Sequence, residues 1–138
     1  MTAPPASTRA RGLQCEVLAA RFLEARGLVI VDRNVRAGGV ELDIVALAPA
    51  GHGDRVDTAV FIEVRSREDD RAGLPEETVD GRKQARLRRG ATAWLVGRDL
   101  WEQVAVRFDV VSVLFGGENT EAPKITWIPG AFEASGGR

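Results

Sequence analysis

Residues 40–47 read VELDIVAL, and residues 58–67 read TAVFIEVRSR. Both runs are apolar and rich in β-branched side chains, and Pro49, Gly51 and Gly53 lie between them. This pattern is typical of a β-hairpin with a long loop. The second run is so apolar at its centre that we expect it to be an interior strand of a sheet.

Acidic side chains interrupt both predicted strands. Because side chains alternate across a strand, Glu41 and Asp43 share one face, and Glu63 and Arg65 share a face of the second strand. Carboxylates on an interior strand are costly unless a metal ion, a cationic partner or solvent stabilises them. A simpler alternative is an ion-pair ladder among Glu63, Arg65, Asp43 and Arg67, which would contribute little to stability.

Composition excludes several classes of function. The chain has 138 residues and a net charge of −1, so a nucleic-acid-binding surface must be a local patch. Cys15 is the only cysteine and His52 the only histidine, which rules out an internal disulfide and argues against a zinc site. The sequence contains neither a membrane-spanning run nor a signal-peptide core, and we expect a cytoplasmic protein.

The first half of the chain predicts a helix and a short strand before the hairpin. Ser7 or Thr8 can cap a helix that runs to about Arg26, and Glu16 lies in line with Ala20 and Leu23 at the edge of its apolar stripe. After the helix we expect a buried strand at Leu28–Val31, a turn at Asp32–Asn34 and a loop containing Arg36, Gly38 and Gly39.

The second half predicts a helix between two further strands. The expected elements are a charged crossing at Arg67–Glu77, a helix from Gly81 to about Val96 capped by Asp80, a strand at Ala105–Phe115, a loop at Gly116–Pro123 and an edge strand at Lys124–Ile128. The helix crossover makes the long strand parallel to the second hairpin strand. The fold class is α/β, a mixed β-sheet flanked by helices in the order α-β-β-β-α-β-β. We expect residues 1–8 to be disordered, 9–129 to form a single domain and 130–138 to be a flexible tail.

An ordered set of short motifs covers about residues 12–133. The motifs are Gly12 and Glu16, Asn34 and Arg36, Glu41-Leu42-Asp43-Ile44-Val45, Phe61-Ile62-Glu63-Val64-Arg65-Ser66-Arg67, Val79 with Arg82-Lys83-Gln84, and Arg107-Phe108-Asp109-Val110-Val111. Together they resemble the PD-(D/E)XK nuclease superfamily, and more closely the YraN family, whose fold is like that of Holliday-junction resolvases. The resemblance implies a restriction-endonuclease-like fold.

The resemblance also implies a metal-dependent site. Asp43 and Glu63 would bind Mg²⁺ or Mn²⁺, Glu16 would add a ligand from the first helix, and the carbonyl of Val64 resembles a further ligand. The superfamily's usual lysine is replaced by Arg65, which stays charged and is therefore a poor general base. Arg65 can still hold a phosphate or stabilise the charge that develops in the transition state.

Basic side chains crowd the first half of the second predicted helix. They could neutralise several phosphates and give salt-dependent, sequence-independent binding, although a solvated helix face is the simpler interpretation. The residues expected to contact nucleic acid are Arg36, Arg67, Arg82, Lys83, Gln84 and Arg86.

These observations lead to one functional prediction and two alternatives. We predict a protein that binds nucleic acid, with DNA as the expected form, and cleaves phosphodiester bonds as a metal-dependent endonuclease directed by substrate structure. The first alternative is a non-catalytic nucleic-acid-binding or assembly module on the same fold. The second is a structural interaction protein whose charges form only ion pairs. By analogy with resolvases, we also expect a homodimer.

Overall fold

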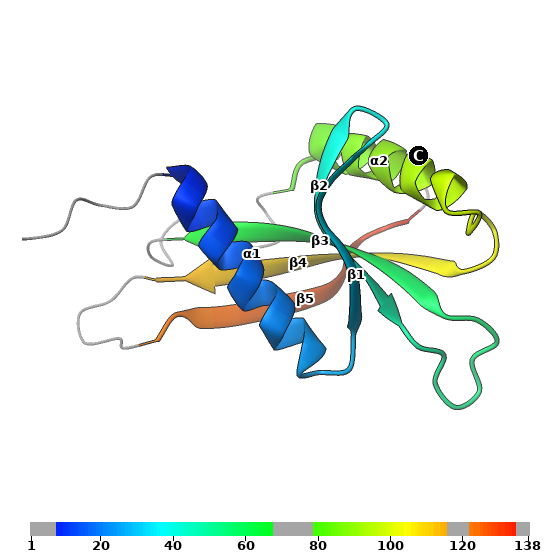
Figure 1. Ribbon diagram of the computed structural model, residues 1–138, viewed down its shortest axis with the longest axis horizontal. Coiled ribbons are helices and arrows are strands. Elements are labelled where there is room, and N and C mark those ends of the chain that lie inside the picture. The colour runs from blue at the N-terminus through cyan, green and yellow to red at the C-terminus, as the bar shows by residue number, and fades with distance from the viewer. Residues whose placement is uncertain (1–7, 68–78, 116–121, 135–138) are drawn as a thin grey trace, which may run out of the picture.

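The computed structural model describes residues 8–67, 79–115 and 122–134 (Figure 1). Within these ranges the chain forms two helices and five strands. The elements are α1 (Thr8–Glu24), β1 (Val29–Ala37), β2 (Val40–Ala48), β3 (Thr58–Arg67), α2 (Gly81–Gly97), β4 (Ala105–Leu114) and β5 (Lys124–Phe132). The predicted order α-β-β-β-α-β-β is confirmed.

The strands form one mixed sheet in the order β1-β2-β3-β4-β5. β3 pairs in parallel with β4, and the other neighbouring strands are antiparallel. β3 is the middle strand, as the apolar run Val60-Phe61-Ile62 predicted. The helical crossover through α2 also produces the parallel β3–β4 pair that was expected from the chain order.

The two helices cover opposite faces of the sheet (Figure 1). Under α1, the buried side chains Cys15, Ala19 and Leu23 pack against residues such as Ile62 of β3. Under α2, Leu87, Ala91, Trp94 and Leu95 pack against a second cluster that includes Phe61. Each helix therefore buries one apolar face against the sheet, and every interior strand has apolar side chains on both faces.

The β1–β2 hairpin lies directly against α2. Its turn is formed by Gly38 and Gly39, whose φ angles of 58° and 75° match a two-residue turn that requires positive φ at both positions. Gly90 of α2 faces the hairpin so closely that a Cβ atom there would lie 3.0 Å from Cβ of Val40. The observed loop is thus shorter than predicted, because Arg36 already belongs to β1.

The predicted turn at Asp32–Asn34 is wrong. These residues lie inside β1. The strand accommodates them by a shift in its register with β2 between Ile30 and Asp32 and by a left-handed backbone at Asn34, with φ of 52°. Turn-forming residues therefore mark a bend in a strand here, not its end. The prediction of a buried strand at 28–31 is also incorrect, since β1 is an edge strand and Val29 is 53% exposed.

Other boundaries shift by a few residues. α1 ends at Glu24, two residues before the predicted end, and β5 continues to Phe132, beyond the predicted end at Ile128. Asp80 caps α2 as predicted, because its Oδ1 accepts a hydrogen bond of 2.9 Å from the backbone N–H of Lys83. Predictions for segments 1–7, 68–78, 116–121 and 135–138 lie outside the described residues. Neither described helix is long and apolar enough to cross a membrane.

Candidate functional site

Asp43 and Glu63 come together where β2 separates from β3. The antiparallel pairing of β2 with β3 ends at Ile44 and Ile62, and Asp43 and Glu63 are the next residues along the two strands. At this point Oδ2 of Asp43 accepts a 2.9 Å hydrogen bond from the backbone N–H of Val64. The loss of strand pairing therefore opens a position in the sheet that the two predicted site acids occupy.

Glu63 is buried and has cationic partners. Its side chain is only 8% exposed, and its Oε1 lies 2.7 Å from Nζ of Lys83 on α2 and 3.6 Å from Nε of Arg65. The contact with Lys83 joins β3 to the first turn of α2. Lys83, predicted as a nucleic-acid contact, thus neutralises a site carboxylate in this structure, and the alternative of a purely surface ion-pair ladder does not fit the burial of Glu63.

Glu16 reaches the same acids from α1. Ala20 and Leu23, which lie in line with it along the helix, are buried, so Glu16 points toward the sheet. Burial raises its pKa, and the charges of Glu41 and Glu63 act in the same direction, against a hydrogen bond with Asn34. Among the described residues its Oε1 atom is buried and lacks a hydrogen-bond partner. The three predicted site acids are thus electrostatically coupled.

The electrostatics of Asp43 show how closely the acids interact. Burial raises the pKa of Asp43 to about 7, and the negative charges of Glu63 and Glu16 add to this effect. The hydrogen bond from Val64 and the positive charge of Lys83 oppose it. Near neutral pH, the Asp43 carboxyl can therefore gain or lose a proton, and a bound cation would favour its charged form.

The donor set suits a hard divalent cation, although it is not arranged as a closed cage. Mg²⁺ prefers oxygen ligands and usually takes one or two protein carboxylates, with water completing its shell. Asp43 and Glu63 can supply such carboxylates, and the buried, unpartnered oxygen of Glu16 could add a third. In the described part of the chain, no group of three or more His, Cys, Asp or Glu side chains already has the spacing of a metal site.

A second buried acid, Asp109 of β4, has a structural role. It is fully buried, and both of its oxygens accept bonds of 2.9 Å from Arg107, from Nε1 of Trp127 and from the backbone N–H of Gly130. Four donors satisfy this carboxylate. Asp109 therefore differs from the three site acids, which are crowded by one another.

The predicted nucleic-acid contacts divide into exposed side chains of α2 and side chains that already interact within the protein. Arg82 and Arg86 are exposed on α2, and Arg89, one turn further on, continues the same face. Gln84 instead donates to the carbonyl of Val79 and accepts from Arg88. Arg36 of β1 donates to the turn carbonyl of Gly39, and Arg67 is half-buried at the end of β3.

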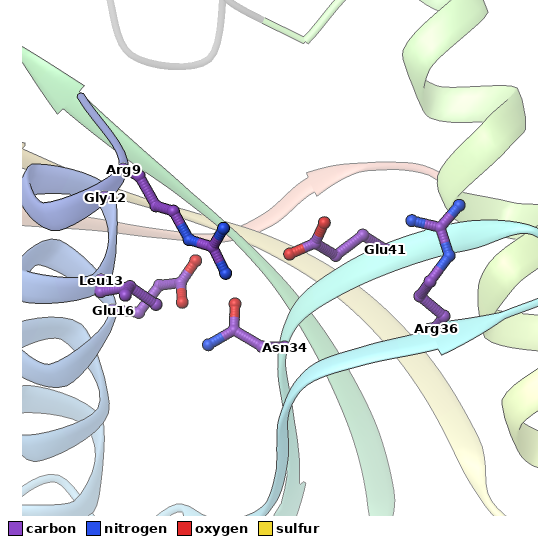
Figure 2. A pocket seen from close by; sticks show the side chains of 7 residues that line it. All are labelled: Arg9, Gly12, Leu13, Glu16, Asn34, Arg36 and Glu41. Atoms are coloured by element: carbon purple, nitrogen blue, oxygen red, sulfur yellow. The ribbon is translucent and has the colours of Figure 1, made fainter. Parts of the chain in front are cut away.

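Two hollows flank the β1–β2 hairpin. The smaller one, of about 270 Å³, is lined by Val40, Glu41, Asp43, Glu63, Lys83, Arg86 and Leu87. The larger one, of about 590 Å³, is lined by Arg9, Gly12, Leu13, Glu16, Asn34, Arg36 and Glu41 (Figure 2). Glu41 lines both. Sequence reasoning missed Arg9 and Leu13, although Arg9, Gly12, Leu13 and Glu16 follow the i, i+3, i+4, i+7 spacing of one helix face.

Comparison with known proteins gives consistent matches. A family model described as uncharacterised protein family UPF0102 matches residues 15–113. A UPF0102 protein of Anaeromyxobacter dehalogenans is 42% identical over 129 residues, which cover 93% of this chain and 87% of the relative. UPF0102 proteins of Pseudomonas putida and Myxococcus xanthus are 38% and 39% identical, over 94% and 96% of this chain and 98% and 96% of theirs. The matched residues include all of the proposed site acids.

Proposed function

The chain belongs to the uncharacterised protein family UPF0102, and we propose that it binds nucleic acid and hydrolyses phosphodiester bonds at a divalent-metal site on Asp43 and Glu63. The YraN family to which the sequence pointed is this family, so that prediction is confirmed. The activity is our proposal.

The observation that carries the proposal is the placement of two acids at one break in the sheet. Asp43 and Glu63 line the same hollow where the pairing of β2 with β3 ends, and the mutual repulsion of the acids helps to raise the pKa of Asp43 to about 7. Maintaining such repulsion costs stability, and strongly perturbed acids in a hollow are more typical of reactive sites than of scaffolding. Asp109, with its four donors, is the contrasting case of an acid that serves the fold.

Mg²⁺ or Mn²⁺ would be held by Asp43 and Glu63, with Glu16 as an auxiliary ligand. Bound there, such an ion supplies a Lewis acid for the phosphoryl group and lowers the pKa of an attacking water. Arg65, close to Glu63, stays charged and can hold a phosphate oxygen. Lys83 brings a lysine ammonium to the site from α2, so the replacement of the superfamily's usual lysine by Arg65 does not leave the site without one.

The exposed face of α2 would bind the substrate backbone. Arg82, Arg86 and Arg89 present three guanidinium groups beside the smaller hollow, whose lining includes Arg86. Contacts of this kind position phosphates without reading sequence. We therefore propose binding that depends on substrate structure. A homodimer, expected by analogy, remains a separate proposal, and a monomer mass in light scattering at every protein concentration would refute it.

One observation favours a non-catalytic member as the second candidate function. The 2.7 Å contact between Lys83 and Glu63 already neutralises one of the acids without any metal ion. If this pair is permanent, the same fold would bind nucleic acid through α2 and leave the bond intact. Metal binding separates the two candidates.

The test is a cleavage assay with Mn²⁺ on branched, flapped, single-stranded and duplex DNA. Asp43→Ala and Glu63→Ala should each abolish cleavage, and Glu24→Gln, at an exposed position of α1, should leave it unchanged. Cleavage that survives both alanine variants would come from a contaminant. If the wild type binds DNA but neither cleaves it nor takes up Mn²⁺ in calorimetry, the non-catalytic alternative replaces the proposal.

A further inference from the structure

We propose that the larger hollow binds an unstacked nucleobase, so that the preferred substrate has unpaired nucleotides at the site. This inference rests on the proposed function and names the substrate class for the same site. It does not follow from the carboxylates alone, because metal-dependent hydrolysis requires only the phosphate. It follows from the lining of the hollow and from its connection to the acids.

The hollow is built by three elements that the fold holds in place. α1 contributes Arg9, Gly12, Leu13 and Glu16, which form one face of the helix, and β1 and β2 contribute Asn34 and Glu41. Figure 2 shows Arg9, Glu16, Asn34 and Glu41 directed into a common space, while Arg36 points away toward α2. Its volume of about 590 Å³ lies within the range of small-ligand sites, roughly 300–1,000 Å³.

The chemistry of the lining fits a base better than a phosphate. Among the charged side chains directed into the hollow, Arg9 is positive and Glu16 and Glu41 are negative, so an anion in the hollow would meet more carboxylates than guanidinium groups. The edge of a base carries both donors and acceptors, which carboxylates and the Asn34 amide can match. Leu13, 46% exposed, offers an apolar surface, and the Arg9 guanidinium is a plane on which a ring can stack.

Asn34 is held at the border of the hollow by its backbone and by Glu16. Its left-handed backbone, with φ of 52°, is one that asparagine adopts more readily than most residues other than glycine. Its side chain hydrogen-bonds Glu16. The Asn34 amide is therefore placed beside the space that the base would occupy.

The position of the hollow explains why the base must be unpaired. Glu41 lines both hollows, so the base site is contiguous with the acids that would act on the phosphate. A base stacked inside a duplex cannot enter a side pocket unless it leaves the stack, which costs energy that a single strand, a flap or a branch point largely avoids. The geometry therefore favours substrates with unpaired nucleotides.

The chain offers a clean way to fill the hollow. A Cβ atom at Gly12 would meet no other atom within 4 Å, so Gly12→Leu adds bulk to the cavity without disturbing the packing of α1. Gln14→Leu is the matched control, because Gln14 is exposed on the same helix and does not line the hollow. Asn34→Gly is a second variant, since glycine adopts the positive φ freely and only the amide is lost.

The experiment measures dissociation constants in EDTA for one fluorescent oligonucleotide, single-stranded or in a duplex. We expect the wild type to bind the single strand about tenfold more tightly than the duplex. We also expect that a single strand that lacks the base of one nucleotide binds more weakly than the intact strand by a similar factor. Gly12→Leu and Asn34→Gly should abolish both effects, and Gln14→Leu should keep them.

Each outcome separates this inference from the proposed function. Equal affinity for single strand and duplex, unchanged by Gly12→Leu, would overturn the base site and leave nucleic-acid binding intact. Equal weakening of single-strand and duplex binding by Gly12→Leu would mean that the hollow does not read bases. A wild type that binds neither form even at low salt would refute the proposed function together with the base site.

Discussion

At the scale of single residues, the main unfavourable interaction is the electrostatic repulsion among Asp43, Glu63 and Glu16. Asp43 alone illustrates its effect, because the folded state raises its pKa from 3.8 to about 7 through burial and neighbouring acids. A folded protein with such a group binds the proton more tightly than the unfolded chain does. The site acids therefore weaken the fold where they are ionised, which is the expected cost of holding a potential cation site.

The first prediction concerns stability as a function of pH without divalent metals. The stabilisation from protonated Asp43 is fully present below its unfolded pKa of about 4 and is lost as pH rises through about 7. We expect the free energy of unfolding in urea to fall by roughly 1–3 kcal/mol between pH 5 and pH 8. Asp43→Asn should remove most of this slope, since its amide oxygen still accepts from Val64.

Glu24→Gln provides the control, because Glu24 is an exposed acid on α1 and its change should leave the slope intact. An unchanged slope in Asp43→Asn would mean that the Asp43 carboxyl titrates normally and that the site is more open to water than its burial indicates.

Single residues also show how far sequence reasoning reaches. The two apolar runs predicted that Asp43 and Glu63 belong to neighbouring strands. The position of Glu16 beside the apolar stripe of the first helix predicted that it lies at the edge of the core. The contact of Lys83 with Glu63 could not be predicted, because it depends on where α2 lies over the sheet. The burial of Asp109 was equally hidden, since its donors come from two different strands.

At the scale of elements, the contact between α2 and the β1–β2 hairpin sets the shape of the site. Gly90 allows the helix to approach the hairpin, and the same helix carries Lys83 to Glu63 two turns earlier. A change in the distance between helix and hairpin would therefore move the ammonium relative to the carboxylate. The approach of α2 to the hairpin thus helps to set the distance between Lys83 of α2 and Glu63 of β3.

The second prediction tests this close approach. A Cβ atom at position 90 would lie 3.0 Å from Val40 and 3.1 Å from Leu42, so Gly90→Leu forces α2 away from β2. We expect it to lower the free energy of unfolding by about 1–3 kcal/mol, as overpacking in cores does. Gly12→Ala, also inside a helix but with open space around it, should raise stability by up to about 1 kcal/mol.

Urea denaturation curves of Gly90→Leu and Gly12→Ala measure both changes in the free energy of unfolding. Stabilisation by both substitutions would show that helix propensity dominates at both sites and that the hairpin yields easily to α2.

The elements also explain why sequence reasoning was wrong at β1. Asp32, Arg33 and Asn34 have the composition of a turn, yet Asp32 accepts bonds from Trp94 and Arg98 of the α2 region, and Asn34 bonds Glu16 of α1. Tertiary partners on both sides of the sheet therefore stabilise polar residues inside a strand. Local composition records the polarity but not these partners.

At the scale of the whole molecule, the distribution of charge matters more than its sum. The net charge of −1 gives no general attraction to a polyanion. The structure nevertheless places Arg82, Arg86 and Arg89 on one exposed face of α2, next to the hollow that contains Asp43 and Glu63. The acids are crowded into the sheet break, so a polyanion that follows α2 meets cations first and the buried carboxylates only at the site.

The third prediction follows from this arrangement. Replacing Arg82, Arg86 and Arg89 together by Gln should weaken DNA binding at low salt and reduce the slope of log affinity against log salt by about 2–3, since each phosphate contact contributes about 0.7–0.9. Lys83 is left in place, because its loss would also expose Glu63 without its partner. Fluorescence anisotropy across a salt series measures both quantities.

A control with the same change in net charge makes the test specific to the α2 face. Arg21, Arg33 and Arg55 are exposed and lie outside α2, so their joint replacement by Gln should lower the affinity much less and leave the salt slope nearly unchanged. Similar losses in both triple variants would show that only total charge matters. In that case α2 would not be the nucleic-acid-binding face, and the substrate would have to approach the acids from another side of the sheet.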